Sequence, residues 1–149
     1  MSINRWIRHS EAADDGFSLI ELLVVIIIIG ILAAIAVPVF LNQRSKGDDA
    51  AAKSDLRNLA NFEEIYIGDF DSYGSVNAVI LAEPHLQPSH TVTLAVVRYD
   101  GLKGYCLSAT ATSSGRVWYW DSQSGGLQAK GASGCPVTTT GTAGGSVTG

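Results

Sequence analysis

The chain has 149 residues, of which 46% are hydrophobic, and a net charge of −4 at pH 7. This length allows one modest domain, and a negative chain without a Lys/Arg-rich block excludes general nucleic-acid binding. It contains no Gly-rich phosphate loop, no H-E-x-x-H motif and no paired catalytic residues. The sequence therefore predicts neither an enzyme nor a bound cofactor.

The first sixteen residues, MSINRWIRHSEAADDG, are polar. Two basic and three acidic side chains give this segment a net charge of −1: Arg5, Arg8, Glu11, Asp14 and Asp15. The arginines favour a cytoplasmic N-terminus. However, Arg44 and Lys46 flank the other end of the apolar segment equally, so charge alone leaves the orientation undecided.

The residues from Leu22 to Leu41 carry no ionisable side chain. A helix of twenty residues is about 30 Å long, which is the thickness of a hydrocarbon core, so this run predicts a transmembrane helix. A secretory signal peptide is the alternative, but its apolar region is shorter and ends at a small-residue cleavage site, which this run lacks. Glu21 stands directly against the run, where a simple anchor needs no carboxylate.

The sequence from Gly16 to Val25, GFSLIELLVV, is followed at once by the rest of this apolar run. It resembles the processing motif of type IV pilins and pseudopilins, and the resemblance continues to about Arg44 before it thins over the remainder. It implies that a prepilin peptidase cleaves after Gly16 on the cytoplasmic face and methylates Phe17. The leader is then 1–16, and the mature chain has 149 − 16 = 133 residues. Acidic residues precede Gly16 where the family usually has a basic one.

Cleavage would place Glu21 four residues, about one helical turn, from a new ammonium group on Phe17. In a fibre of bundled helices, an unpaired carboxylate would cost several kcal/mol. The ammonium of an adjacent subunit would relieve that cost only in the correct axial stagger. We therefore predict that Glu21 sets the assembly register, as the resemblance also implies. The alternative is that Glu21 only marks the membrane boundary.

Gly30 and Pro38 interrupt the apolar helix, predicted to span 17–46, at two depths. Proline removes a helical hydrogen bond, and glycine permits local melting. The resemblance implies helix-break positions, between which the helix loosens when the subunit enters a filament. Both residues are also common in ordinary transmembrane helices, so the sequence leaves that alternative open.

An amphipathic helix is predicted from Gly47 to about Gly68. Its apolar residues recur at spacings of 4, 3, 3 and 4, which is the stripe of a helix that docks on a sheet: Ala52, Leu56, Leu59, Phe62 and Tyr66. Gly47 is the expected break between this helix and the apolar one. The following segment, 68–90, is expected to form a loop.

Three strands are predicted near 92–96, 105–112 and 116–120, with turns at 100–104 and 113–115. The expected fold class is α+β, with a long N-terminal helix packed on a small antiparallel sheet of about three strands. The head covers 47–135, and Trp118 and Trp120 share one face of the last strand. The Thr- and Gly-rich tail, 136–149, is expected to be flexible.

Cys106 and Cys135 are the two cysteines of the chain. If the head is exported, they pair as a disulfide worth about 2–4 kcal/mol; in a cytoplasmic head they stay reduced. The acidic sequence from Asp69 to Gly74 resembles the start of a calcium loop, but Tyr73 and Ile80 stand where oxygen ligands belong. No metal site is predicted.

These observations predict a structural subunit of a type IV pilus-like surface filament. It is stored in the cell membrane by one helix and then polymerises through that helix. The expected partners are other copies of the chain, prepilin peptidase, the inner-membrane assembly platform and the membrane, with no specific nucleic acid. One alternative is a pseudopilin of a type II secretion or DNA-uptake machine. Another is a monomeric membrane-anchored ectodomain.

Overall fold

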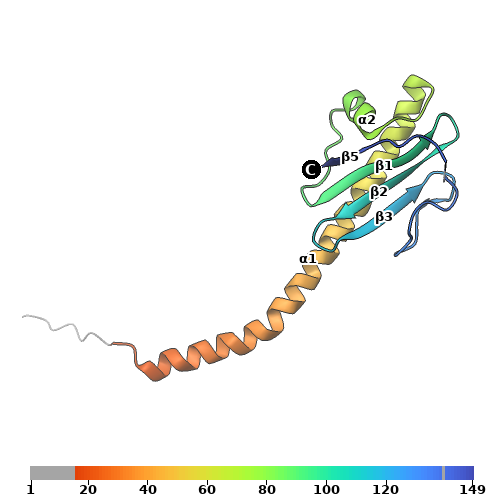
Figure 1. Ribbon diagram of the computed structural model, residues 1–149. Coiled ribbons are helices and arrows are strands. Elements are labelled where there is room, and N and C mark those ends of the chain that lie inside the picture. The colour runs from red at the N-terminus through yellow and green to blue at the C-terminus, as the bar shows by residue number, and fades with distance from the viewer. Residues whose placement is uncertain (1–15, 139) are drawn as a thin grey trace, which may run out of the picture. The chain divides into compact units, whose positions relative to one another are not determined.

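The computed structural model describes residues 16–138 and 140–149 (Figure 1). The predicted leader, including Asp14 and Asp15, lies outside the described residues apart from Gly16. The chain divides into two compact units between Val39 and Phe40. This boundary lies a few residues before the one expected at 46/47.

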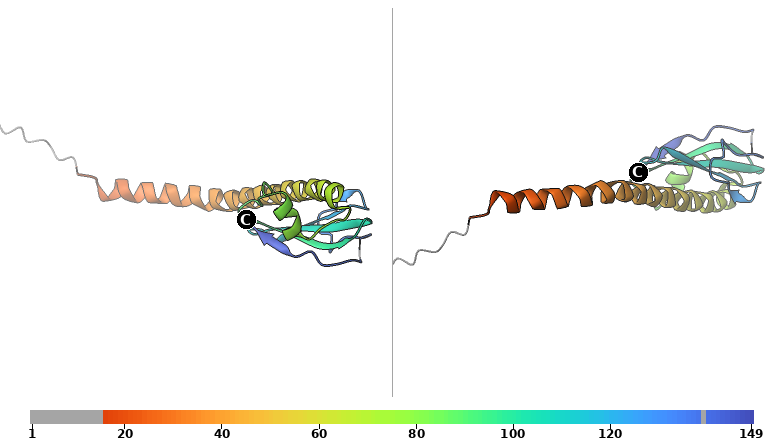
Figure 2. Two further views of the ribbon diagram at one scale, coloured as in Figure 1. Left: turned by 90° about the horizontal axis from the view of Figure 1, so that it is seen from above. Right: turned by 90° about the horizontal axis from the view of Figure 1, so that it is seen from below.

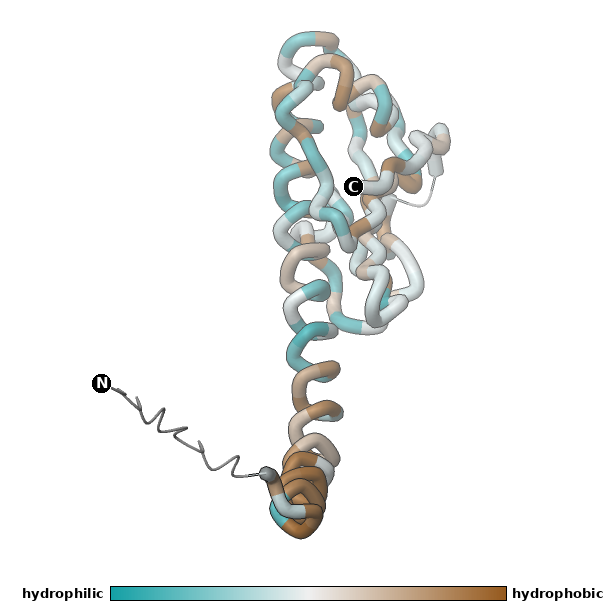
Figure 3. The backbone as a smooth tube through the Cα atoms, turned by 90° about the vertical axis from the view of Figure 1, so that its left-hand side faces the viewer, coloured by the Kyte–Doolittle hydropathy of each residue, from teal (hydrophilic) through white to brown (hydrophobic). Residues whose placement is uncertain are grey.

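Helix α1 (Leu19–Phe70) begins in the first unit. The apolar window of this helix has a mean hydropathy of 3.3, and none of it is buried against the rest of the chain. Figure 3 shows the concentration of hydrophobic residues in the first half of α1. By length and composition this is a helix able to cross a membrane.

The expectation of a break at Gly47 was wrong, because α1 is continuous from Leu19 to Phe70. A glycine inside a helix costs only about 1 kcal/mol relative to alanine. Asp49 and Ala52, shortly after Gly47, are buried against the head, and this tertiary contact outweighs the local cost. The helix also runs through Gly30 and Pro38.

The second half of α1 lies along one face of the sheet (Figure 2). Of the predicted apolar stripe, Ala52, Leu56 and Leu59 are completely buried, and Phe62 and Tyr66 are partly buried against the same core. The stripe is thus the packed face of the helix.

Five antiparallel strands form the sheet, in the order β4-β3-β2-β1-β5. The three predicted strands are present as β1 (Val92–Asp100), β2 (Gly104–Ala111) and β3 (Arg116–Asp121). The predicted number of three was too low, because two short edge strands complete the sheet: β4 (Gly126–Leu127) and β5 (Ser146–Thr148). Strands of two and three residues are too short to show an alternating pattern.

The C-terminal segment differs from the expected flexible tail. Val147 of β5 pairs with Leu94 of β1, and Thr142 exchanges backbone hydrogen bonds with Tyr99 at 2.8 and 2.9 Å. Gly144 passes so close to β1 that a Cβ atom there would lie 2.5 Å from the side chain of Val96. The glycines that suggested disorder are what permits this close backbone approach.

A short helix, α2 (Val76–Ala82), occupies part of the segment expected to be a loop. The Ser75 hydroxyl caps it by accepting a hydrogen bond from the Ala78 amide at 3.2 Å. Val76 and Val79 are completely buried, and the helix contacts β1 and β5. Its apolar run is too short for a helical period to be read from sequence.

Candidate functional site: the start of helix α1 and the disulfide-bonded head

The predicted cleavage site lies immediately before α1. Gly16 and Phe17 have no regular secondary structure, and Phe17 is 84% exposed. A protease needs an exposed segment whose backbone is free of helical hydrogen bonds, and the Gly16–Phe17 bond meets both conditions.

Ser18 and Glu21 form a capping box at the start of the helix. The Ser18 amide donates a hydrogen bond to Glu21 Oε2 at 2.9 Å, and the Glu21 amide donates to Ser18 Oγ at 3.2 Å. This pairing satisfies two backbone donors that the helix leaves free and fixes where α1 begins. The Ser-x-x-Glu spacing predicts such a box, and the sequence reasoning missed it.

The Glu21 carboxylate stands among exposed apolar side chains. A shallow surface beside it is lined by Phe17, Ile20, Val24 and Val25. A charged group so placed gains from the positive end of the helix dipole. It also lies one turn from the position where cleavage would create an ammonium group on Phe17.

Comparisons with known proteins concern the same segment of the chain. Residues 13–37 match the family model described as the prokaryotic N-terminal methylation motif. The major component of the type IV wide pilus of Thermus thermophilus is 36% identical over 104 residues, which cover 70% of this chain and 78% of that protein. The chain belongs to the type IV pilin family.

Two further relatives of this pilin match over shorter regions. The type IV major pilin protein of Myxococcus xanthus is 41% identical over 60 residues, or 40% of this chain and 27% of that protein. The type II secretion system core protein G of Pectobacterium carotovorum is 34% identical over 83 residues, or 54% of this chain and 53% of that protein. The pilin spans about half, or less, of these two relatives.

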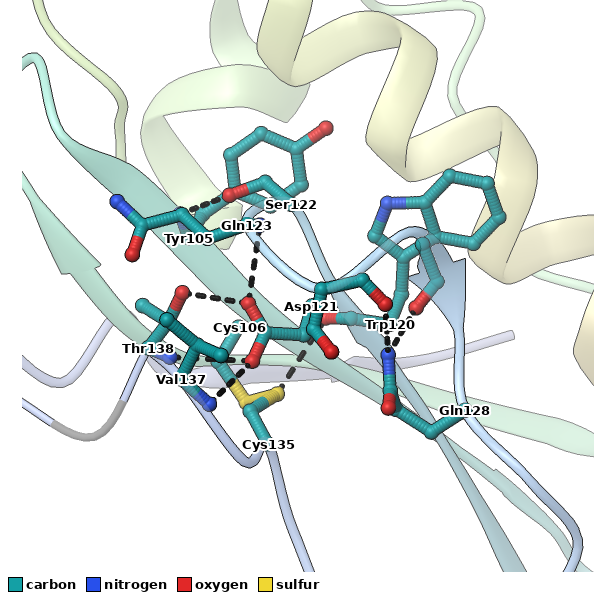
Figure 4. Close-up of a disulfide and its surroundings, with 12 residues drawn as sticks. Tyr105, Cys106, Trp120, Asp121, Ser122, Gln123, Gln128, Cys135, Val137 and Thr138 are labelled. Atoms are coloured by element: carbon teal, nitrogen blue, oxygen red, sulfur yellow. Dashed lines mark hydrogen bonds between the residues drawn. A yellow bond between two sulfur atoms is a disulfide. The ribbon is translucent and has the colours of Figure 1, made fainter.

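In the head of the pilin, Cys106 and Cys135 form a disulfide (Figure 4). The predicted pairing is confirmed. The bond attaches the segment after β4 to strand β2, across a sequence separation of 29 residues. A link over a loop of this length stabilises a small domain by about 2–4 kcal/mol.

Asp121, directly opposite Cys106 in the β2–β3 pairing, holds the same segment from a second side. It is completely buried, and its carboxylate accepts hydrogen bonds from the Val137 and Thr138 amides at 2.8 and 3.0 Å and from Thr138 Oγ1 at 2.6 Å (Figure 4). Burial acts to raise the pKa of Asp121, but these hydrogen bonds and one from the Gln123 amide lower it overall. No motif in the sequence indicates this role of Asp121.

A second buried carboxylate lies near the C-terminal end of α1. Glu63 is completely buried; its Oε2 accepts a hydrogen bond from the Gly74 amide at 3.0 Å, and its Oε1 has no partner among the described residues. Burial raises the pKa of Glu63 to about 7. The adjacent Glu64 accepts a hydrogen bond from the Tyr105 hydroxyl at 2.9 Å, and burial together with Glu64 raises the pKa of Tyr105.

Other acidic residues of α1 tie the helix to the loops around the sheet. Asp55 accepts hydrogen bonds from the Ser89 amide at 2.6 Å and the Ser89 hydroxyl at 3.1 Å. Asp49 forms an ion pair with Arg116 of β3. Both of these acidic residues are therefore buried, although neither belongs to the apolar stripe.

The described ranges, 16–138 and 140–149, contain no group of three or more His, Cys, Asp or Glu side chains arranged to hold a metal ion. The calcium-loop candidate Asp69 and Asp71 are both exposed. Asp71 instead directly follows the last residue of α1, with a positive φ of 53°.

Proposed function

We propose that this pilin is a structural subunit of a surface filament, made as a membrane precursor and polymerised through the first half of α1. The observation that carries the proposal is that the apolar half-helix, most of which lies within the methylation motif, is not buried by the rest of the chain. Exposed apolar surface of this size needs lipid or other copies of the same helix to cover it. Other copies replace the lipid when the filament forms.

Processing is the first step in this proposal. Prepilin peptidase cuts the accessible Gly16–Phe17 bond and methylates Phe17, with the N-terminus in the cytoplasm. The subunit is therefore a substrate of an enzyme rather than an enzyme. The inner-membrane assembly platform then draws it from the membrane.

In the second step, Glu21 sets the axial register between neighbouring subunits. In the precursor the Glu21 carboxylate is engaged in its own helix cap by Ser18. In the bundled filament core, water no longer solvates this charge, and the Phe17 ammonium of an adjacent subunit neutralises it. The segment between Gly30 and Pro38 loosens on assembly, because those residues hold the helix least firmly.

Two substitutions separate the charge of Glu21 from its capping role. Glu21→Gln keeps a side-chain acceptor for the Ser18 amide but removes the charge, whereas Glu21→Ala removes both. We expect both variants to be processed and inserted but to form no filaments, because neither can pair with an ammonium. Microscopy of surface filaments and N-terminal mass analysis of the membrane fraction measure the two outcomes. Normal filaments from Glu21→Gln would refute the register role.

A pseudopilin of a secretion or DNA-uptake machine is the second candidate, and the match to secretion protein G supports it. The match to the wide-pilus component covers more of this chain, 70% against 54%, which favours the pilus. Purification of sheared surface fibres with N-terminal mass analysis distinguishes the candidates. Abundant fibres starting at methylated Phe17 support a pilus subunit, whereas a subunit processed at Phe17 without abundant surface fibres would indicate a pseudopilin. A retained Met1 and no polymer would indicate a monomeric ectodomain.

A further inference from the structure

Basic side chains gather in one shallow pocket between α1 and β3. The described ranges hold eight of the ten Lys and Arg residues, since Arg5 and Arg8 lie before them. Four of those eight line this pocket of about 210 Å³, which we call the basic pocket: Lys46, Asp49, Lys53, Arg116, Trp118 and Lys130. Half of the basic residues of an acidic head thus face one small space.

The charges in the basic pocket do not balance. Asp49 forms its ion pair with Arg116, and the Lys53 ammonium lies 4.2 Å from the centre of the Trp118 ring. Within residues 16–138 and 140–149, Lys46, Lys53 and Lys130 make no ion pair. Four cations and one carboxylate give the pocket a net charge of +3. The cationic side chains repel one another, and an external anion would relieve this repulsion.

The opposite imbalance occurs where α1 ends, at a segment that we call the acidic tip: Asp69, Phe70 and Asp71. All three residues are exposed, and Phe70 is 57% exposed. The last turn of α1 has no basic residue, and among the described residues neither aspartate makes an ion pair. Negative charge at a helix C-terminus is unfavourable because the helix dipole is also negative there. The local fold therefore gives these acids no electrostatic benefit.

The two charged regions lie at opposite ends of the head. Lys46 and Asp69 are 23 residues apart on one helix, which corresponds to about 35 Å. The acidic tip lies near the β1–β2 turn, where the Tyr73 amide donates to the Gly101 carbonyl at 3.0 Å. The basic pocket lies at the other end of the sheet, at the start of β3. Because of this separation, one copy cannot neutralise its own imbalance.

We propose that the acidic tip of one subunit docks in the basic pocket of a second copy of the chain. A contact between two different surfaces of identical subunits repeats from copy to copy, and it builds an open filament when its rotation does not close a ring. The proposal rests on the filament function above and adds a head-to-head contact to the helical core. It explains both charge imbalances with one occupant, and it predicts assembly that weakens as salt screens the contact.

Charge reversal of either end, and then of both, tests the pairing. The basic-end variant is Lys46→Glu with Lys130→Glu, which spares the Lys53–Trp118 and Arg116–Asp49 contacts. The acidic-end variant is Asp69→Lys with Asp71→Asn, because asparagine tolerates the positive φ of that position. Arg57→Glu with Arg98→Glu is the matched control, since it reverses two exposed cations outside the pocket. Sheared-filament yield is compared with the wild type.

We expect each single-end variant to lower filament yield about tenfold, as for the loss of one or two ion pairs per contact. The combined variant, with both ends reversed, should recover most of the yield, and the control should keep it. Normal yield from either single-end variant would overturn the proposal. The proposal would also be overturned if the combined variant failed to recover filament yield while it kept its disulfide on a non-reducing gel and its normal level in the membrane.

A second measurement does not depend on how the charge variants fold. A photoreactive phenylalanine analogue at Phe70 should cross-link within wild-type-like filaments to a peptide that contains Arg116 or Lys130. Cross-links only to other surfaces, or binding of the basic pocket to inorganic phosphate without such cross-links, would overturn docking of the tip. Absence of filaments from the wild type itself would instead defeat the filament function and this inference with it.

Discussion

At the scale of single residues, the head buries two carboxylates in different electrostatic surroundings. Asp121 is surrounded by donors, so its charged form is favoured, whereas Glu63 has one donor and an unpartnered oxygen, so its neutral form is favoured. The two pKa shifts therefore have opposite directions and opposite consequences for stability. Replacing each carboxylic acid with its isosteric amide tests the corresponding pKa shift.

Glu63 should make the head less stable as the pH rises. Its pKa is 4.5 in the unfolded chain and about 7 in the folded head. Between these values the folded state binds more protons than the unfolded state. The free energy of unfolding therefore falls by up to about 3 kcal/mol as the pH rises through this interval. Glu63→Gln should remove this fall, as measured by tryptophan fluorescence during denaturation at pH 5 and pH 8. An unchanged pH dependence in the variant would contradict the assignment.

Asp121 should contribute stability at neutral pH that is lost as acid protonates it, because its pKa is lowered in the folded state. Asp121→Asn sets an amide N–H against backbone donors and should cost about 2 kcal/mol or more at pH 7. The deficit should shrink below the ordinary aspartate pKa. Denaturation at pH 7 and pH 3 measures it, with Asp69→Asn as an exposed control that should behave like the wild type.

At the scale of elements, the least regular segments complete the sheet. β5 pairs with β1 only because the glycines before it approach the strand closely, and the Cys106–Cys135 bond holds the preceding segment in place. An edge strand formed in this way covers backbone groups of β1 that would otherwise be open to pairing with another chain.

Gly144→Ala should detach β5, because the added Cβ would meet Val96 at 2.5 Å. We expect a loss of about 1–3 kcal/mol, typical of overpacking, and faster amide exchange at Val96, whose amide donates to Gly145. Gly134→Ala is the control, because that position is open and has no positive φ. Equal exchange rates in the two variants would show that the close approach does not hold the strand.

At the scale of the whole molecule, the two units have separate sources of stability. Every buried residue from the described core lies at or after Asp49. The unit beginning at Phe40 contains the disulfide, the sheet and all of that core. The apolar window of the first unit, in contrast, is not buried within the chain, so under the proposed function lipid or other copies cover it.

A fragment starting at Phe40 should therefore fold without the first unit. We expect a soluble monomer with its disulfide formed, because no core contact is removed and the exposed apolar helix is gone. Near-ultraviolet circular dichroism and sedimentation measure fold and mass. An unfolded fragment would show that the first half of α1 contributes to head stability.

Much of this pilin was predictable from local pattern. The methylation motif, the apolar helix and the three main strands depend on residue type at fixed spacing, which a single sequence displays directly. Continuity of α1 through Gly47, the pairing of β5 and the role of Asp121 were not predictable. Each depends on partners distant in the chain, Asp121 with Thr138 and β5 with β1, for example.

The sequence by itself determined the family, the methylation motif and the apolar character of the first half of α1, because those lie in one contiguous segment. Only the tertiary structure decided which charged side chains are paired inside the head and which stay at its surface without a partner among the described residues. Asp49, Asp55 and Asp121 look like surface acids in sequence, yet folding gives them internal donors. That internal pairing leaves Lys46, Lys130 and the acidic tip available for another subunit.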